Sequence, residues 1–186
     1  GPGSAYFSDH SKPPMRSYSL LLVLLTFGAC AAQNTFTLRS ADLGGQATLD
    51  QVFNGFGCAG ANKSPQLAWT NAPVGTKSFA ITMYDPDAPT GSGWWHWLVF
   101  DIPATVHELP TGAGSAPGQG MPATAVQSIT DFGATGYGGP CPPPDDGLHQ
   151  YIITVFALNT EQLGLDQKAN AAMVGFNLNQ HVLAKA

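Results

Sequence analysis

The chain has 186 residues, of which 44% are hydrophobic and only 10% are charged, and its formal net charge at pH 7 is −5. Seven Lys or Arg against twelve Asp or Glu leave no basic patch, which excludes recognition of nucleic acid through its phosphate backbone. The length suits a single domain with a sizeable core, and the low charge with 22 glycines and 15 prolines favours a β-rich secreted domain.

The N-terminal residues have the pattern of a targeting segment. Residues 1–14 are interpreted as an added leader and are set aside. Residues 15–32 begin with Met-Arg, continue with an apolar run over 20–27 and end in small residues, as a secretory signal does. The run is shorter than the roughly 20 residues of a membrane helix. We expect a periplasmic or secreted protein of residues 33–186; the alternatives are a lipoprotein signal that anchors Cys30 and an N-terminal helix packed in the fold.

The interpretation of the three cysteines depends on the expected export to an oxidising compartment. If Cys30 is removed or lipidated, Cys58 and Cys141 remain. Two cysteines in an oxidising compartment favour one disulfide. The alternative is two separate buried thiols, which behave as small apolar groups.

Hydrophobic patterning predicts a mainly β fold. Strands are expected at 35–43, 66–70, 79–85, 95–103 and 148–159. Between them lie a long Gly/Pro/Ala loop over 104–125 and a rigid loop over 136–147, whose prolines have no N–H to give to a sheet. Residues 165–186 are typical of helical turns. Many short strands and one late helix indicate an antiparallel β-sandwich with C-terminal helical segments.

Four polar side chains are expected to meet at one rim of the sheet. Asp85 ends one predicted strand and His96 begins the next, so antiparallel pairing puts both at the same edge. His149 begins the last strand, and the two-residue period puts Tyr151 on the same face. The loop 139–144 forms the wall of this rim.

This set of groups is suited to an anion. Two imidazoles and a phenol donate hydrogen bonds, and Asp85 orients a histidine and raises its pKa. Asp87 and Pro89 shape the turn on the opposite side. No Lys or Arg is nearby in the sequence, so binding of phosphate or carboxylate is expected to be modest and sensitive to pH. Since Trp95 and Trp97 are expected on one face and His96 on the other, only some indoles are expected to line the pocket.

Plainer interpretations stay open. An Asp-Pro-Asp sequence is a common turn, and His96 is a candidate core histidine. His149 can be a simple strand end and Tyr151 an ordinary sheet residue. Asp85, His96 and His149 also resemble a two-His-one-carboxylate metal site, but the usual tight His-x-Asp spacing is missing. The sequence contains no Gly-x-Ser-x-Gly elbow. We therefore expect no enzyme, no catalytic residues, no metal and no cofactor, and treat His107 and His181 as structural or surface residues.

Three longer motifs carry a family resemblance. "DPDAPTGSGWWHW" (85–97) and "GYGGPCPPPDDGLHQY" (136–151), together with "GCAGANKSPQLAW" (57–69), resemble the phosphatidylethanolamine-binding protein family, in particular its bacterial Raf-kinase-inhibitor-like branch. The similarity runs from about residue 36 to 181. It implies a large central antiparallel sheet packed on a smaller sheet, helices near the C-terminus, and a small pocket for phosphate, phosphorylethanolamine-like groups or other anions.

The resemblance also implies site residues. Carried over motif by motif, the ligand-binding positions are Asp85, Asp87, Pro89, His96, Cys141, Pro142, His149 and Tyr151. Cys141 stands where animal members have glycine, and a bond to Cys58 would pin the loop that contains Cys58 across the site.

Departures from the family limit what is transferred. The chain ends in "HVLAKA", where many bacterial members continue into a further strand, so that sheet edge is expected to be open or covered by another segment. A homodimer is suggested by the family alone. The second function considered is a protein-interaction inhibitor of a kinase or protease, with the pocket incidental and the loop 104–125 or a sheet edge as the contact; an enzyme is the third.

Overall fold

The structure is a computed structural model that describes residues 34–116 and 118–186, and residues 34–186 form one compact unit. The expected leader, the signal and the lipidation site Cys30 lie outside the described residues. In the described part of the chain, no helix has both the length and the apolar character that crossing a bilayer requires.

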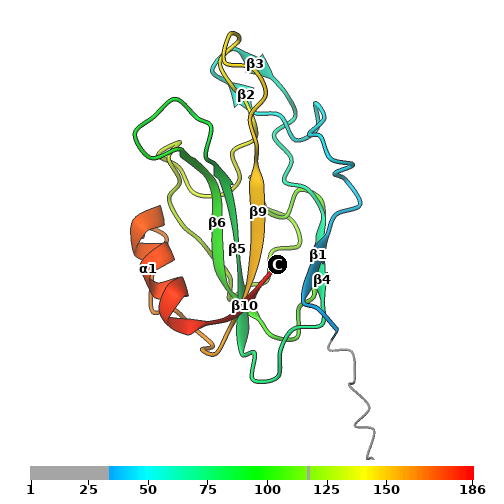
Figure 1. Cartoon of the computed structure of the whole chain (residues 1–186), viewed down its shortest axis with the longest axis vertical. Coiled ribbons are helices and arrows are strands. Elements are labelled where there is room, and N and C mark those ends of the chain that lie inside the picture. The colour runs from blue at the N-terminus through cyan, green and yellow to red at the C-terminus, as the bar shows by residue number, and fades with distance from the viewer. Residues whose placement is uncertain (1–33, 117) are drawn as a thin grey trace, which may run out of the picture. The chain divides into compact units, whose positions relative to one another are not determined.

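A five-stranded antiparallel sheet forms the centre of the fold (Figure 1). Its order is β10-β9-β5-β6-β8, with the bounds β5 Ser78–Asp85, β6 Trp94–Pro103, β8 Val126–Gln127, β9 Ile152–Leu158 and β10 Val182–Lys185. A three-stranded sheet, β1-β4-β7, contains β1 Thr37–Arg39, β4 Leu67–Thr70 and β7 Glu108–Leu109. A two-stranded hairpin consists of β2 Asn54–Gly55 and β3 Cys58–Ala59, and the single helix described is α1 Ala171–His181. The predicted mainly β fold with a large and a smaller sheet is confirmed.

The two faces of the central sheet make two cores. Along β5, Phe79 and Ile81 belong to the cluster that contains Trp69 of β4 and the small sheet. The residue between them, Ala80, belongs to the other cluster, which contains Val174 of α1. The central sheet is thus covered by the small sheet on one face and by α1 on the other (Figure 1). Because both faces are buried, β5 carries an almost continuous apolar run.

The C-terminal segment differs from the prediction. Asn170 caps α1 by accepting a hydrogen bond from the Met173 N–H at 2.9 Å, and the helix ends at His181. The following residues pair with β9 as the edge strand β10, and the N–H of Ala186 donates to the Val155 carbonyl at 3.0 Å. The prediction of helical turns to residue 186 is therefore wrong, because the unpaired edge of β9 stabilises an extended conformation that local propensity does not show.

Two further boundaries are corrected. The segment 104–125 was predicted as loop throughout but contains β7, which pairs with β4. The last long strand was predicted from 148, but β9 begins at Ile152. The N–H of Gln150 donates to the Asp87 side chain at 2.7 Å instead of joining the ladder, so His149 and Tyr151 lie in the segment that leads into β9.

Candidate ligand-binding site

A β-bulge in β6 positions His96. Met83 of β5 pairs with Trp97 and Tyr84 pairs with Trp95, so His96 is the extra residue between them. Trp97 belongs to the core cluster beside the small sheet, whereas Trp95 packs against the other cluster, on the face covered by α1. The prediction that Trp95 and Trp97 share one face is wrong, because strict two-residue alternation holds only in a strand without a bulge.

The turn after β5 is organised by its two aspartates. Asp85 Oδ1 accepts from the backbone N–H groups of Asp87 and Ala88 at 2.9 and 3.1 Å. Asp87 Oδ2 accepts from the Gln150 N–H, which ties the turn to the segment before β9. Asp87 is therefore a positioning residue that does not line the cavity, whereas Pro89 of the same turn does.

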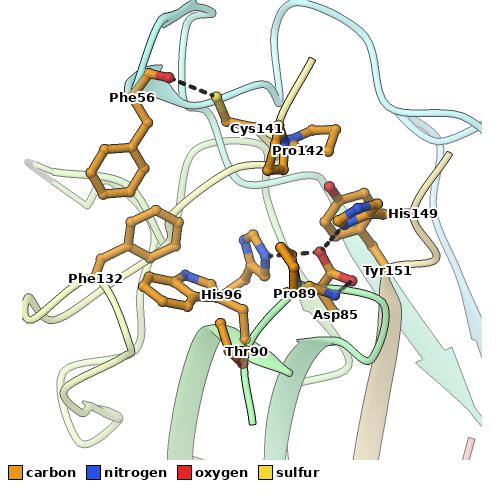
Figure 2. A pocket seen from close by; sticks show the side chains of 13 residues that line it. Phe56, Asp85, Pro89, Thr90, His96, Phe132, Cys141, Pro142, His149 and Tyr151 are labelled. Atoms are coloured by element: carbon orange, nitrogen blue, oxygen red, sulfur yellow. Dashed lines mark hydrogen bonds and ion pairs between the residues drawn. The ribbon is translucent and has the colours of Figure 1, made fainter. Parts of the chain in front are cut away.

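Asp85 and His149 form a buried pair at the floor of the site (Figure 2). Asp85 Oδ2 lies 2.7 Å from His149 Nδ1, and the two side chains are only 4% and 2% exposed. The hydrogen bond to Asp85 is the main cause that raises the pKa of His149, with smaller contributions from the charges of Asp146 and Asp87. Since His149 Nε2 lies 3.6 Å from Asp146, both of its ring nitrogens face carboxylates, and the charged imidazole offsets the charge of Asp85.

The ring of His96 is fixed by Gly138. Nδ1 of His96 lies 2.7 Å from the Gly138 carbonyl oxygen, and the Gly138 N–H donates to the His96 carbonyl at 2.9 Å. A carbonyl oxygen only accepts, so Nδ1 carries the proton and Nε2 of the neutral ring presents a lone pair. Burial lowers the pKa of His96 more than the Gly138 carbonyl and Asp85 raise it, so the neutral ring is expected near pH 7.

Two polar atoms of the site have no protein partner. Within residues 34–116 and 118–186, His96 Nε2 and the Tyr151 hydroxyl are buried and make no hydrogen bond. His96 Nε2 is 4.0 Å from Asp85 Oδ2, beyond hydrogen-bonding range. Burial is the main cause that raises the pKa of Tyr151 far above its usual range, so its hydroxyl stays protonated and can donate.

These groups open into a cavity of about 180 Å³. Thirteen residues line it: Phe56, Asp85, Ala88, Pro89, Thr90, Trp94, His96, Phe132, Cys141, Pro142, Pro143, His149 and Tyr151. None of these described lining residues is Lys or Arg, and most of the exposed wall is apolar. The cavity thus combines a small polar floor with an apolar wall, as ligand sites commonly do.

The wall opposite the turn is held by a disulfide. Cys58 of β3 is bonded to Cys141, so the predicted disulfide is present and joins the β2–β3 hairpin to the loop that precedes His149. Figure 2 also marks the Phe56 carbonyl oxygen near Cys141 Sγ at 3.7 Å. A bonded sulfur carries no proton, so we treat this approach as a contact. Gly139 allows the loop to pass closely by the segment 51–53 that leads into the hairpin, because a Cβ there would lie 1.9 Å from the Gln51 carbonyl oxygen.

The sequence-derived site is largely brought together. Seven of the eight predicted residues line the cavity, namely Asp85, Pro89, His96, Cys141, Pro142, His149 and Tyr151. Phe56 and Phe132, which lie just before two of the motifs but outside them, were not predicted from the sequence, and Trp94 was not singled out among the tryptophans. The two glycines that flank Phe56 were the one available signal of a special turn. As for metals, no three His, Cys, Asp or Glu side chains in the described ranges are grouped so as to hold an ion.

The fold and site define a β-sandwich protein with a small pocket at the end of its central sheet, and comparisons place it among known proteins. A sequence profile of the phosphatidylethanolamine-binding protein family matches residues 40–186. The UPF0098 protein YbcL of Escherichia coli (strain K12) is 51% identical over 90% of this chain and 92% of its own length. The UPF0098 protein YbhB of the same organism is 55% identical over 73% of this chain and 84% of its own.

Solved structures agree. The crystal structure of E. coli YbcL, described as a member of the mammalian PEBP family, superposes with a TM-score of 0.79 at 52% identity. It covers 81% of this chain and 93% of that one. A PEBP homologue from Chlamydia trachomatis gives 0.64 at 26% identity over 82% and 94% of the two chains. The chain belongs to the phosphatidylethanolamine-binding protein family.

Proposed function

We propose that the chain is a binding protein whose pocket holds a small anion: phosphate, a phosphorylated head group such as phosphorylethanolamine, or a carboxylate. One observation carries this proposal, namely that His96 Nε2 and the Tyr151 hydroxyl are buried without partners and belong to the same cavity. A buried polar group without a partner costs about 1–3 kcal/mol. A ligand oxygen that bonds to both atoms would recover much of that free energy.

The charge state of the site specifies the form of the anion. Tyr151 donates, whereas His96 Nε2 accepts in the neutral ring, so the singly charged form of phosphate matches both with a P–O⁻ and a P–OH. The doubly charged form of inorganic phosphate also keeps one P–OH, but a second charge is costly to bury in a cavity without Lys or Arg. A group with no acidic proton, such as a carboxylate or a doubly charged phosphate monoester, requires that His96 first gain a proton. Binding is therefore expected to strengthen as the pH falls. Without Lys or Arg in the lining, the affinity is expected to be modest.

The role expected for His149 changes in this proposal. From the sequence it was expected to donate to the ligand together with His96. With its nitrogens directed at Asp85 and Asp146, His149 instead holds Asp85 in place and balances its charge. His149 is thus a positioning residue, and Tyr151 is the donor.

The test is a titration with inorganic phosphate from pH 5 to 8, followed through the histidine ring signals in NMR spectra. We expect the signal of His96 to shift on addition of phosphate, with tighter binding at pH 6 than at pH 8. Tyr151→Phe, which removes one hydroxyl, is expected to weaken binding by a factor of about ten to a hundred, since a hydrogen bond to a charged group contributes roughly 1.5–3 kcal/mol.

Tyr84→Phe is the matched control. It removes a hydroxyl that donates to the Ser92 carbonyl at 2.9 Å outside the cavity, so phosphate affinity should not change. If phosphate moves no histidine signal at any pH, the anion-binding proposal is wrong. A protein-interaction inhibitor of a kinase or protease is then the function to pursue, through partner binding that His96→Ala and Tyr151→Phe leave unchanged.

Two further parts of the proposal concern location and chemistry. Export to the periplasm or outside the cell, with a lipid anchor at Cys30 as the alternative, is supported by the Cys58–Cys141 disulfide, because disulfides persist in oxidising compartments.

A binding role without catalysis is supported by two lining side chains. The Thr90 hydroxyl donates to the Gly93 carbonyl, and Cys141 is bonded, so neither is free as a nucleophile. Mass measurement of the exported chain and turnover assays on phosphate and carboxylate esters test these two statements.

A further inference from the structure

An aromatic wall forms the end of the cavity away from His149. Phe56 and Phe132 stack with ring centroids 5.8 Å apart at 11°, and Trp94 meets Phe132 edge to face at 5.4 Å. All three residues line the cavity, whereas Phe53 packs against both phenylalanines and does not line it. Figure 2 shows Phe56 and Phe132 across the site from Asp85 and His149, with the His96 ring between the two groups.

Phe56 is an unusual residue for its position. It connects β2 and β3, has a φ of 54° in the left-handed region, and is 74% exposed. A bulky residue at positive φ is disfavoured, and such outliers persist where the surroundings fix them, often at ligand sites. Here the fixing element is the disulfide, because Cys58 lies two residues after Phe56 and is bonded to Cys141 of the cavity wall.

The size of the cavity limits what contacts this wall. A volume of about 180 Å³ is comparable to the roughly 150 Å³ of an apolar cavity that accommodates benzene. The enclosed volume thus holds about one ring or one head group and not a long acyl chain, so an anion bonded to Tyr151 and His96 leaves its substituent at the mouth, where Phe56 is exposed. The rings contact one another instead of surrounding a hollow, and Trp94 stands nearly perpendicular to Phe132, so they form an apolar wall and not an aromatic cage for a quaternary ammonium group.

Resting on the anion-binding function above, we propose that the pocket selects anions with a flat apolar substituent, such as an aryl phosphate, and that Phe56 determines this specificity. The anionic group meets Tyr151 and His96, and the ring of the ligand packs on Phe56, Phe132 and Trp94. The ammonium group of phosphorylethanolamine would lose hydration against this apolar wall and gain only a weak cation–π contact with an exposed ring in return.

The experiment compares three probes on the full chain by isothermal titration calorimetry at pH 6: inorganic phosphate, phenyl phosphate and phosphorylethanolamine. Burial of one ring face predicts that phenyl phosphate binds about tenfold more tightly than phosphate. Phe56→Ala should weaken phenyl phosphate binding much more than phosphate binding and so remove most of this gain, whereas Phe56→Tyr, which keeps the ring, should retain it. Leu148→Ala is the matched control, since Leu148 is 94% exposed next to His149 and does not line the cavity.

The outcomes separate this inference from the function on which it rests. If phosphate binds but phenyl phosphate binds no more tightly, or phosphorylethanolamine binds best, the aromatic specificity is overturned and the anion site stands. The specificity role of Phe56 is also overturned if Phe56→Ala weakens phosphate as much as phenyl phosphate, or if Leu148→Ala has the same effect as Phe56→Ala. If none of the probes binds the unaltered chain, both proposals fail.

Discussion

Breaking the Cys58–Cys141 bond is expected to destabilise the protein while the pocket keeps its phosphate affinity. The bond closes a loop with a sequence separation of 83 residues. In the chain-entropy treatment, a loop of that length corresponds to about 15 cal/mol/K, or roughly 4.6 kcal/mol at 25 °C, of unfolded-state entropy removed. This is a large share of the 5–15 kcal/mol by which a domain is typically stable.

Breaking the bond should raise the entropy of the unfolded chain but change the folded structure of the pocket only slightly, because other contacts hold the same two segments together. The Phe53 N–H donates to the Pro140 carbonyl at 3.0 Å, and the Gly139 N–H donates to Asn62 Oδ1 at 2.8 Å. These bonds do not depend on the sulfur atoms. Phosphate affinity is therefore expected to change less than threefold, whereas Phe56, two residues from Cys58, should lose part of its contribution to phenyl phosphate binding.

The assay is urea unfolding followed by tryptophan fluorescence, comparing the oxidised protein with Cys58→Ala/Cys141→Ala. Unaltered protein treated with a thiol reductant is the control, since it lacks the bond but keeps both side chains. We expect both forms to lose 3–5 kcal/mol, with the treated protein showing that the loss does not come from the substitutions. A loss below about 1 kcal/mol in both would refute the reasoning that this bond restricts the unfolded chain.

Three other predictions follow from single contacts. Asp85→Asn should destabilise the protein most near pH 6, and its difference in unfolding free energy from the unaltered chain should shrink as the pH rises through the folded-state pKa of His149. The reason is that the raised pKa of His149 stabilises the fold only while the ring is charged. Unfolding at pH 6 and at pH 9 measures this, and a difference that does not change with pH would contradict it. Asn170→Ala removes the cap of α1 and should cost about 1 kcal/mol in thermal unfolding, with Asn170→Asp, which can still accept, as the tolerated control. Gly139→Ala places a Cβ 1.9 Å from the Gln51 carbonyl oxygen and should lower the melting temperature by several degrees and weaken phosphate binding. Gly44→Ala is the control, because a Cβ there has open space and the backbone is not at positive φ, so phosphate affinity should not change.

The sequence determined those features that follow from local pattern and chain direction. The buried runs of β5, β6 and β9 were visible as apolar segments, because strands covered on both faces need them. Asp85 at the end of one strand and His96 at the start of the next had to share an edge once the strands were antiparallel. The start of the third predicted strand and its two-residue period placed His149 and Tyr151 at the same rim, and the motif resemblance implied the same residues.

Only the tertiary structure decided the features that depend on register and on residues far apart in the chain. The bulge that turns His96 away from simple alternation is a property of the pairing between β5 and β6, and neither strand alone shows it. The last residues of the chain became β10 because β9 offers an open edge, a stabilisation absent from local propensity. Phe56 and Phe132 entered the site because a disulfide and ring packing bring their loops together, and such long-range contacts leave no periodic signal in the sequence.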